Sequence, residues 1–258
     1  MNKTRKDVVG RTIVYGAHPV FETIKAARRQ VYEIFLVKGS EVEKRLSREN
    51  GDLHPKFRYL SGIELDALTR DVKNQGIAAY VSPFPYDDFE IEVLKLRSSQ
   101  KCLVLLLDQV QDPNNFGNIL RSACCFGVDL VVISKDRAVS VTPAVEKASA
   151  GSSAHMKICR CSNLSRSLEA LKDIGCWVYG ADARTGTNHF ETDFSGKIAL
   201  VVGAEGKGLR RLVRENCDIL IKIPMTGSVG SLNVSNATSI ILAEAFRQGK
   251  FLQNKPKN

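Results

Sequence analysis

The sequence has no cysteine pair with the CxxC spacing of a metal or redox site, although seven cysteines occur among its 258 residues. Their number is odd and several lie inside apolar runs, so they are interpreted as small core residues of a reduced protein. No apolar run approaches the ~20 residues of a membrane helix. The basic start MNKTRKDVVGR lacks the apolar core of a signal peptide. These absences predict a cytoplasmic protein with no membrane partner.

The chain also lacks the common nucleotide-binding and hydrolytic motifs. Neither the GxxxxGK[ST] spacing of a P-loop nor the GxGxxG dinucleotide fingerprint is present. The polar loops contain no Ser/His/Asp order, no metal-ligand spacing and no paired carboxylates, and His155 and His189 are isolated in the sequence. We therefore expect no metal site.

A basic excess is present instead. Lysine and arginine number 37 against 28 acidic residues, which leaves a net charge of +9 and a pI near 9.2. Such a balance favours polyanionic partners such as nucleic acid. Residues 1–58 hold 13 basic and 7 acidic side chains, whereas residues 59–98 hold 4 and 7. The excess therefore lies at the N-terminal end and again after residue 98, as two separate basic surfaces would require.

The first third of the chain alternates helical and strand patterns, which predicts a small α/β domain over residues 1–81. Its basic side chains fit either contacts with phosphates or ordinary solvated helix faces. They form two clusters, Lys25, Arg28 and Arg29, and Lys44, Arg45 and Arg48. The predicted helices cover about 19–29, 40–49 and 62–70, and the predicted strands cover 32–37, 57–60 and 77–81.

Residues 82–99 combine two prolines with an acidic run and are interpreted as a linker that ends in a short helical stretch. A second domain, 100–258, begins with CLVLLL at 102–107, a continuous apolar run typical of a parallel strand buried on both faces. The alternation of strands and helices that follows indicates a mostly parallel sheet covered on both sides. Further strands are predicted at 130–133, 156–159, 176–179, 198–202 and 218–223.

Three polar loops follow strand ends in the second domain, where open parallel sheets bind their ligands. In the first loop, residues 112–114 predict a turn and a helix starts near Gly117, so that Arg121 lies one turn into the helix, near Asn115. In the second loop, Glu205 is the sole acid among glycines that let the backbone approach a ligand. The ordinary alternatives are a surface arginine and a tight turn with an exposed glutamate.

The third loop, 227–233, joins a strand that ends near Ile223 to a helix predicted over 234–248. It is rich in backbone and hydroxyl donors, including Ser228 and Ser231, and the N–H groups of the helix start suit an anion. An ordinary strand-to-helix turn is the alternative. Together, the loops supply an arginine, a glutamate, amides and hydroxyls, a set suited to holding a charged organic cofactor and a hydroxyl nucleophile.

The same three loops carry a family resemblance. DPNNFGNILRSA, GAEGKGL and IPMTGSVGSLNVSNA resemble the three ordered motifs of the SpoU, or TrmH, class of RNA ribose 2′-O-methyltransferases. YGAHPVFETI near the N-terminus and VEKASAGSSAHMKICRCSNL at 145–164 resemble the rRNA guanosine-2′-O (RlmB-like) branch, so the similarity covers nearly the whole chain. The resemblance implies a SPOUT α/β catalytic domain with a deep trefoil knot, bound S-adenosylmethionine, a homodimer, and an N-terminal L30e-like domain that binds RNA.

The resemblance also assigns roles to individual residues. Tyr179 to Asp182, at another strand end, match a segment that touches the adenosine moiety. The rRNA branch usually has glutamate before SLNVS, where this chain has Gly230, and this departure weakens any inference about the exact nucleotide. The implied catalytic residues are Asn115, Arg121, Glu205, Ser231 and Asn233, and the implied cofactor contacts are Gly203, Ile223, Met225, Leu232 and Asn233.

The predicted function is S-adenosylmethionine-dependent 2′-O-methylation of a guanosine in 23S rRNA. Arg121 is expected to clamp the phosphate and ribose, with Asn115 and Ser231 orienting the hydroxyl and with Glu205 and Asn233 holding Arg121 and the loops. Helix 234–248 is expected to close the knot and to help bury the dimer interface. Methylation of tRNA and a non-catalytic RNA-binding or assembly role are the alternatives, and no DNA partner is expected.

Overall fold

The computed structural model describes residues 10–49, 56–183, 186–227 and 230–249. The basic start of the chain and Ser228 therefore lie outside the described residues. Contacts divide the chain into one unit of residues 1–85 and 141–155 and a second of 86–140 and 156–258. The second unit thus differs from the predicted domain 100–258 in two places, since it includes residues 86–99 and lacks 141–155.

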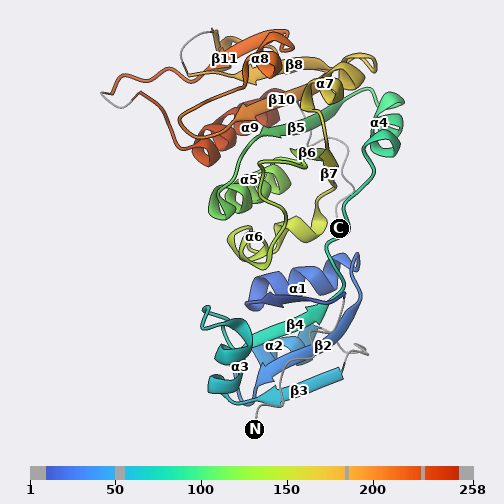
Figure 1. The fold of residues 1–258 in the computed structure, drawn as a ribbon, viewed down its shortest axis with the longest axis vertical. Helices are drawn as coiled ribbons and strands as arrows, with labels where there is room; N and C mark the ends of the chain where they lie inside the picture. The colour runs from blue at the N-terminus through green and yellow to red at the C-terminus, as the bar shows by residue number, and fades with distance from the viewer. Residues whose placement is uncertain (1–9, 50–55, 184–185, 228–229, 250–258) are drawn as a thin grey trace. The chain divides into compact units, whose positions relative to one another are not determined.

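The first unit contains a four-stranded mixed sheet in the order β1-β4-β2-β3 (Figure 1). One face of the sheet packs Val14 against Phe21, and the opposite face packs Tyr15 against Leu65, as the alternation of side chains along a strand requires. The elements of this unit are β1 (Thr12–Tyr15), α1 (Ala17–Ala26), β2 (Val31–Val37), α2 (Glu41–Glu49), β3 (Lys56–Leu60), α3 (Gly62–Thr69), β4 (Ile77–Val81), α6 (Pro143–Ala148) and the 3-10 helix η1 (Ser152–His155).

Helix α6 belongs to the first unit although it lies between two strands of the second unit's sheet in the sequence. An ion pair between Arg29 and Glu146, 2.5 Å long, is buried there, with side chains only 2% and 3% exposed. Arg29 Nε also donates to the Ser82 carbonyl at 2.7 Å. Burial raises the pKa of Glu146 to about 7, and the charge of Arg29 opposes that rise. The pair therefore joins α6 to the end of α1 and to the strand end at Ser82.

The second unit contains a seven-stranded sheet in the order β7-β6-β5-β10-β8-β11-β9, and all of its strand pairings are parallel. The parallel sheet predicted from the sequence is thus confirmed. Its elements are α4 (Phe89–Arg97), β5 (Cys102–Asp108), α5 (Pro113–Cys125), β6 (Leu130–Ser134), β7 (Ile158–Cys161), α7 (Leu164–Lys172), β8 (Trp177–Ala181), β9 (Thr187–Asn188), η2 (His189–Glu191), β10 (Lys197–Gly203), α8 (Arg211–Glu215), β11 (Ile219–Lys222) and α9 (Val234–Gly249).

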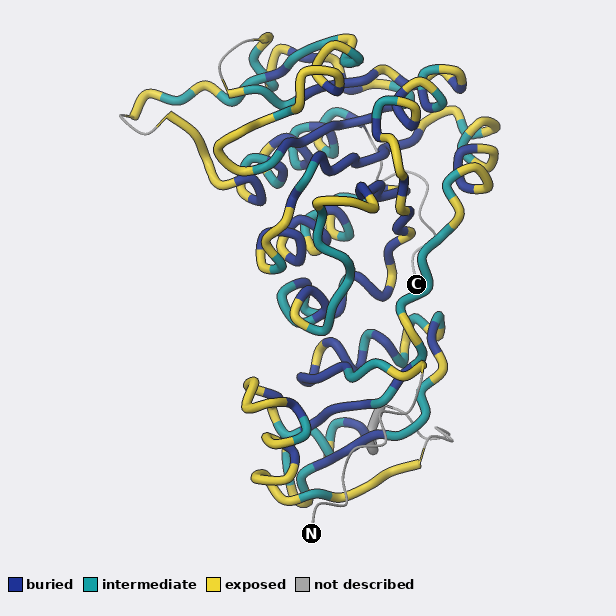
Figure 2. The backbone as a smooth tube through the Cα atoms, in the orientation of Figure 1, coloured by how far each residue is buried: buried dark blue, intermediate teal, exposed yellow. Residues whose placement is uncertain are grey.

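Helices cover both faces of this sheet. Helices α4, α7 and α8 pack on the face that carries Val104 and Leu106 of β5, while α5 and α9 lie on the other face (Figure 1). A hydroxyl contact between Ser122 and Ser239, 2.7 Å, joins α5 to α9. Every residue of β5 is buried, and Figure 2 shows the central strands as the most buried part of the unit. This double cover explains the unbroken apolar run at 102–107.

The start of α5 corrects one prediction. The helix begins at Pro113 rather than near Gly117, because the Asp112 side chain accepts a hydrogen bond from the Asn115 amide and Pro113 occupies the first helical position. Arg121 consequently lies two turns into the helix instead of one. The predicted linker contains α4, a full helix capped by Asp88. The trefoil knot stays a prediction of the family resemblance.

No helix within residues 10–49, 56–183, 186–227 and 230–249 is long and apolar enough to span a membrane.

Candidate active site

A cavity of about 910 Å³ opens at the carboxyl ends of β8, β10 and β11. It is walled by the loop after β8, the glycine-rich loop after β10, the segment after β11 and the first turns of α9. Its size lies within the range of small-molecule sites. The five residues predicted to contact a cofactor all line it: Gly203, Ile223, Met225, Leu232 and Asn233.

A hydrogen-bonded cluster joins the three motif loops beside this cavity. Glu205 Oε1 accepts hydrogen bonds from the side-chain amides of Asn115 and, at 3.0 Å, Asn233. The same Asn233 Nδ2 also donates to Asn115 Oδ1 at 2.9 Å. Asn115 is buried at 9% exposure, whereas Glu205 and Asn233 are exposed. Glu205 and Asn233 lie 90 and 118 positions after Asn115 in the chain, so the cluster joins distant parts of the sequence.

Asn233 has a second role as the cap of α9. Its Oδ1 accepts from the Ser235 amide at 2.9 Å and from the Ser235 hydroxyl at 2.6 Å. Since a side-chain oxygen placed there satisfies an otherwise unpaired N–H of the first turn, Asn233 fixes the start of the helix. The position of Asn233 toward Glu205 is therefore set by the helix and not by the loop alone.

The glycine-rich loop that carries Glu205 is held by a buried acid at the end of β5. Asp108, fully buried, accepts from the Arg210 amide at 2.9 Å and from Arg210 Nε at 2.6 Å. A bridge between Ala204 and Gly208 closes the loop. A Cβ on Gly203 would come within 2.2 Å of the Gly208 carbonyl carbon, so only glycine permits this approach.

Ser231 and Arg121 are placed differently from the cluster. Ser231 is exposed and lines the cavity, two residues before Asn233. Arg121 is exposed on α5 and does not line the cavity; within the described residues it has no hydrogen-bond or ion-pair partner. The expected contact of Glu205 with Arg121 is therefore not formed among the described residues, where Glu205 instead binds the two asparagines.

The segment predicted to touch the adenosine moiety lines the cavity only in part. Ala181 and Asp182 line the cavity, but Tyr179 does not, because it is buried and its hydroxyl donates to the Asp193 carbonyl at 2.7 Å. Asp182 also accepts from Arg214 Nε at 3.0 Å across the cavity wall. Gly230 lines the cavity as well, and a Cβ built there meets nothing within 4 Å.

Sequence reasoning missed Asp108 and Arg210, which lie 102 residues apart. The one available signal was an acid ending an otherwise apolar strand. The part of the chain that the structure describes contains no group of three or more His, Cys, Asp or Glu side chains able to hold a metal ion.

Comparison with known proteins matches a family model to each of the two parts of the chain. The model of the SpoU rRNA Methylase family matches residues 102–243, and that of RNA 2′-O ribose methyltransferase substrate binding matches residues 13–87. The 23S rRNA (guanosine-2′-O-)-methyltransferase RlmB of Xanthomonas campestris is 38% identical over 91% of this chain and 96% of its own. A Staphylococcus saprophyticus protein assigned to the TrmH family of tRNA/rRNA methyltransferases is 42% identical over 74% of this chain and 77% of its own.

A solved structure agrees over nearly the whole length. The SpoU methyltransferase AviRb of Streptomyces viridochromogenes, in complex with the cofactor AdoMet, has a TM-score of 0.78 and 25% identity. The match covers 96% of this chain and 94% of AviRb. With the sheet, the three motif loops and both family models in agreement, the chain belongs to the SpoU rRNA methylase family.

Proposed function

We propose that this protein transfers a methyl group from S-adenosylmethionine to a ribose 2′-hydroxyl of RNA, and that the substrate is a guanosine of 23S rRNA. The observation that carries the proposal is the Asn115–Glu205–Asn233 cluster, which stands beside a 910 Å³ cavity at the carboxyl edge of a parallel sheet. The family supports the reaction, and the RlmB relative supports the nucleotide.

The cavity residues fit S-adenosylmethionine. Ile223, Leu232 and Ile241 supply apolar surface of the kind that suits an adenine ring. The glycine-rich loop, 203–208, lets its backbone approach a ligand at Gly206 and Gly208, which line the cavity and carry no side chain. AviRb binds the same cofactor with the same fold. When bound, S-adenosylmethionine supplies an electrophilic methyl group.

The chain's own residues must position and activate a poor nucleophile, the ribose hydroxyl. A guanidinium such as that of Arg121 does not lose its proton near neutral pH, so it acts by charge, holding the phosphate and lowering the pKa of the hydroxyl. Ser231, at the cavity wall, orients the hydroxyl together with Asn115. Glu205 and Asn233 hold Asn115 in place.

The finer assignments belong to the same proposal. RNA is bound by the first unit, whose family model is named for substrate binding, and by the active-site edge of the second. The protein acts as a homodimer in which α9 contributes to the interface, and it works in the cytoplasm, where its seven free cysteines stay reduced. Methylation of tRNA is the competing activity, since the S. saprophyticus relative is described for both RNAs.

Two measurements test the function. Calorimetry with S-adenosylmethionine should give one binding event per chain, and purified protein should transfer labelled methyl groups to 23S rRNA. Mapping 2′-O-methylation across rRNA and tRNA in cells with and without the gene then identifies the nucleotide. Cofactor binding without methyl transfer to any RNA would favour a non-catalytic RNA-binding role.

Replacement of Gly203 by alanine should weaken cofactor binding by at least about tenfold. The new Cβ would collide with the backbone of Gly208 and, at 2.5 Å, with the Leu209 amide, so the loop must move away from the cavity wall. Tenfold corresponds to about 1.4 kcal/mol, which is modest for a backbone displacement. Calorimetry gives the dissociation constant.

Gly230→Ala is the matched control for this loop substitution. Gly230 lines the same cavity, but its Cβ position is open, so cofactor affinity should stay near that of the wild type. Equal cofactor affinity of Gly203→Ala and the wild type would show that the close approach of the loop is not needed for binding.

A further inference from the structure

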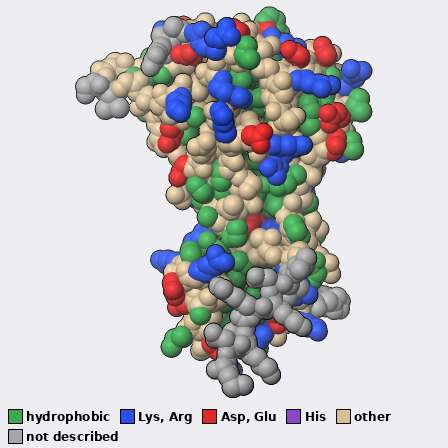
Figure 3. All heavy atoms as spheres, in the orientation of Figure 1, with side chains coloured by type: hydrophobic (Ala, Val, Ile, Leu, Met, Phe, Trp, Pro, Cys, Tyr) green, Lys and Arg blue, Asp and Glu red, His purple; other side chains and the backbone are tan. Residues whose placement is uncertain are grey.

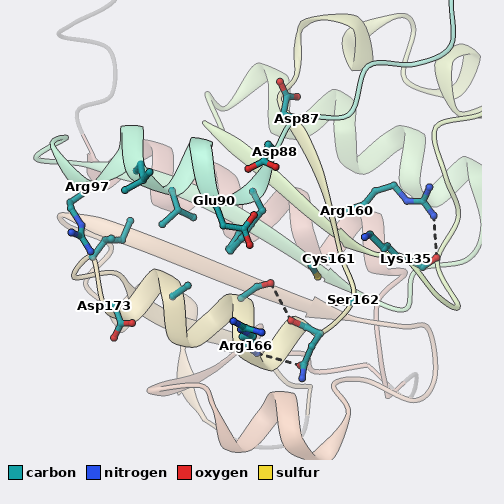
Figure 4. A pocket seen from close by; sticks show the side chains of 17 residues that line it. Asp87, Asp88, Glu90, Arg97, Lys135, Arg160, Cys161, Ser162, Arg166 and Asp173 are labelled. Carbon is teal, nitrogen blue, oxygen red and sulfur yellow. Dashed lines mark hydrogen bonds between the residues drawn. The ribbon is translucent and has the colours of Figure 1, made fainter.

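A second cavity, of about 650 Å³, lies in the second unit between α4, the end of β7 and α7 (Figure 4). None of the candidate active-site residues lines it. Three exposed cations surround one part of it: Lys135 after β6, Arg160 on β7, and Arg166 in the first turn of α7. They stand at the carboxyl ends of neighbouring strands, the same edge of the sheet that carries the candidate active site.

Arg160 is held in place without being neutralised. Arg160 Nη2 donates to the Lys135 carbonyl at 3.3 Å, and its guanidinium lies 5.3 Å from the centre of the Tyr86 ring. Among the described residues, none of Lys135, Arg160 and Arg166 forms an ion pair with a carboxylate. Their charges therefore remain available to a ligand.

The acids of the same cavity are partly engaged elsewhere. Asp87 accepts from the Ile158 amide at 2.9 Å, and Asp88 caps α4 through the Ile91 amide at 3.0 Å. In Figure 4, Arg160 and Lys135 lie at the opposite end of the cavity from Arg97 and Asp173. The end of the cavity nearest the strand termini thus holds Lys135 and Arg160, and Glu90 and Asp173 are the other acids of the lining.

A fourth cation lies at the same edge of the sheet, toward the active site. Arg210 binds Asp108 at the end of β5. In the chain Arg210 directly follows Leu209, which lines the first cavity. Burial raises the pKa of the Cys161 thiol, and a hydrogen bond with Ser167 and the charges of Arg210 and Lys135 oppose that rise. Lys135, Arg160 and Arg166 are called the basic row below, and Arg210, whose charge is paired with Asp108, is not counted in it. In the space-filling view, Lys and Arg side chains are spread over the visible face of the second unit, with Asp and Glu side chains between them (Figure 3).

We propose that the basic row binds the phosphates of the RNA strand that flanks the target nucleotide. The proposal rests on the proposed function, because it extends the path of the same RNA. Strands lie ~4.8 Å apart, so the distance from β5 to β7 is about 10 Å. The row is therefore close enough to the active site to meet phosphates of the same RNA strand, and it contributes affinity rather than base recognition.

Salt dependence of RNA binding tests this row directly. Lys135→Gln, Arg160→Gln and Arg166→Gln should each lower the slope of log affinity against log salt by about one. The triple variant should bind RNA at least about tenfold more weakly near physiological salt, with cofactor affinity unchanged. The probe is a 23S rRNA fragment that the wild-type protein methylates, and titrations by fluorescence anisotropy use the full-length chain.

Lys101→Gln is the matched control, since Lys101 precedes β5 at the opposite, amino edge of the same sheet. It removes the same charge and should leave the salt slope unchanged. If the triple variant keeps the slope and affinity of the wild type while both methylate RNA, the basic row does not contact RNA, and a protein partner becomes the better occupant of the cavity. If the wild type methylates no RNA, the proposed function fails instead.

Discussion

Replacing Arg121 by lysine is expected to lower methyl transfer to RNA by about 10²–10³-fold while the affinity for S-adenosylmethionine stays unchanged. Lysine keeps the positive charge but loses the planar fork that can hold a phosphate and a hydroxyl at once. Cofactor affinity should persist because Arg121 does not line the cavity. Single-turnover kinetics with saturating RNA separate the chemical step from binding.

Arg121→Ala should lose more, about 10³–10⁴-fold, because the charge itself disappears. The control is Arg211→Lys, an exposed arginine of α8 that is already paired with Glu215 at 3.2 Å, and its rate should match the wild type. Arg121→Lys protein that binds cofactor and RNA and methylates at the wild-type rate would remove Arg121 from the reaction. Its lack of a partner among the described residues agrees with a group reserved for substrate.

The strands of the second unit could be predicted because parallel strands buried on both faces need unbroken apolar runs, which the sequence shows at 102–107. The start of α5 could not be predicted from the sequence, because Asp112 and Pro113 are as typical of a turn as of a helix start. The choice depends on whether the Asp112 carboxylate accepts from the Asn115 amide, which it does. Strand β9 has only two residues and leaves no readable pattern.

Residue patterns located the three loops of the candidate site, and the family resemblance assigned roles to their residues. Its motifs named Asn115, Glu205 and Asn233, and the structure brings these three side chains together. The support behind them was not foreseen, because the Asp108–Arg210 contact joins residues that no local pattern links. The packing of α6 in the first unit could not be predicted for the same reason. The sequence of a six-residue helix does not indicate which distant segment of the chain it packs against.

Removing either member of the buried Arg29–Glu146 pair should destabilise the first unit by about 3–5 kcal/mol. Arg29→Met leaves a buried carboxyl group without its partner, which must take up a proton or remain as an unpaired charge, and Glu146→Met leaves a guanidinium whose Nη2 already lacks a partner among the described residues. Hydrogen exchange of the full-length chain, read on the peptides of α1 and α6, should show the loss there. Peptides of β5 and β10 in the second unit should stay protected.

The double variant Arg29→Met, Glu146→Met distinguishes a charge effect from lost packing. Two apolar side chains of similar length leave no buried charge, so most of the lost protection should return. A double variant as unstable as the sum of the single variants would show that packing, and not the unpaired charge, causes the loss. The matched surface control is Lys44→Met, whose exposed pair with Glu41 is screened by solvent, so protection of α1 and α6 should stay as in the wild type.

The pH dependence of the first unit's unfolding free energy is an independent test of the Arg29–Glu146 pair. The pKa of Glu146 in the folded protein is raised by burial to about 7, above the ordinary value of 4.5 that the unfolded chain retains. Between pH 4.5 and 7, Glu146 therefore binds more protons in the folded chain than in the unfolded chain. This difference adds to the free energy of unfolding fully below pH 4.5, and the addition is lost as the pH rises toward 7. Glu146→Gln removes the titrating group, so its unfolding free energy should lack this decline. An identical decline in Glu146→Gln and the wild type would assign the pH dependence to other groups.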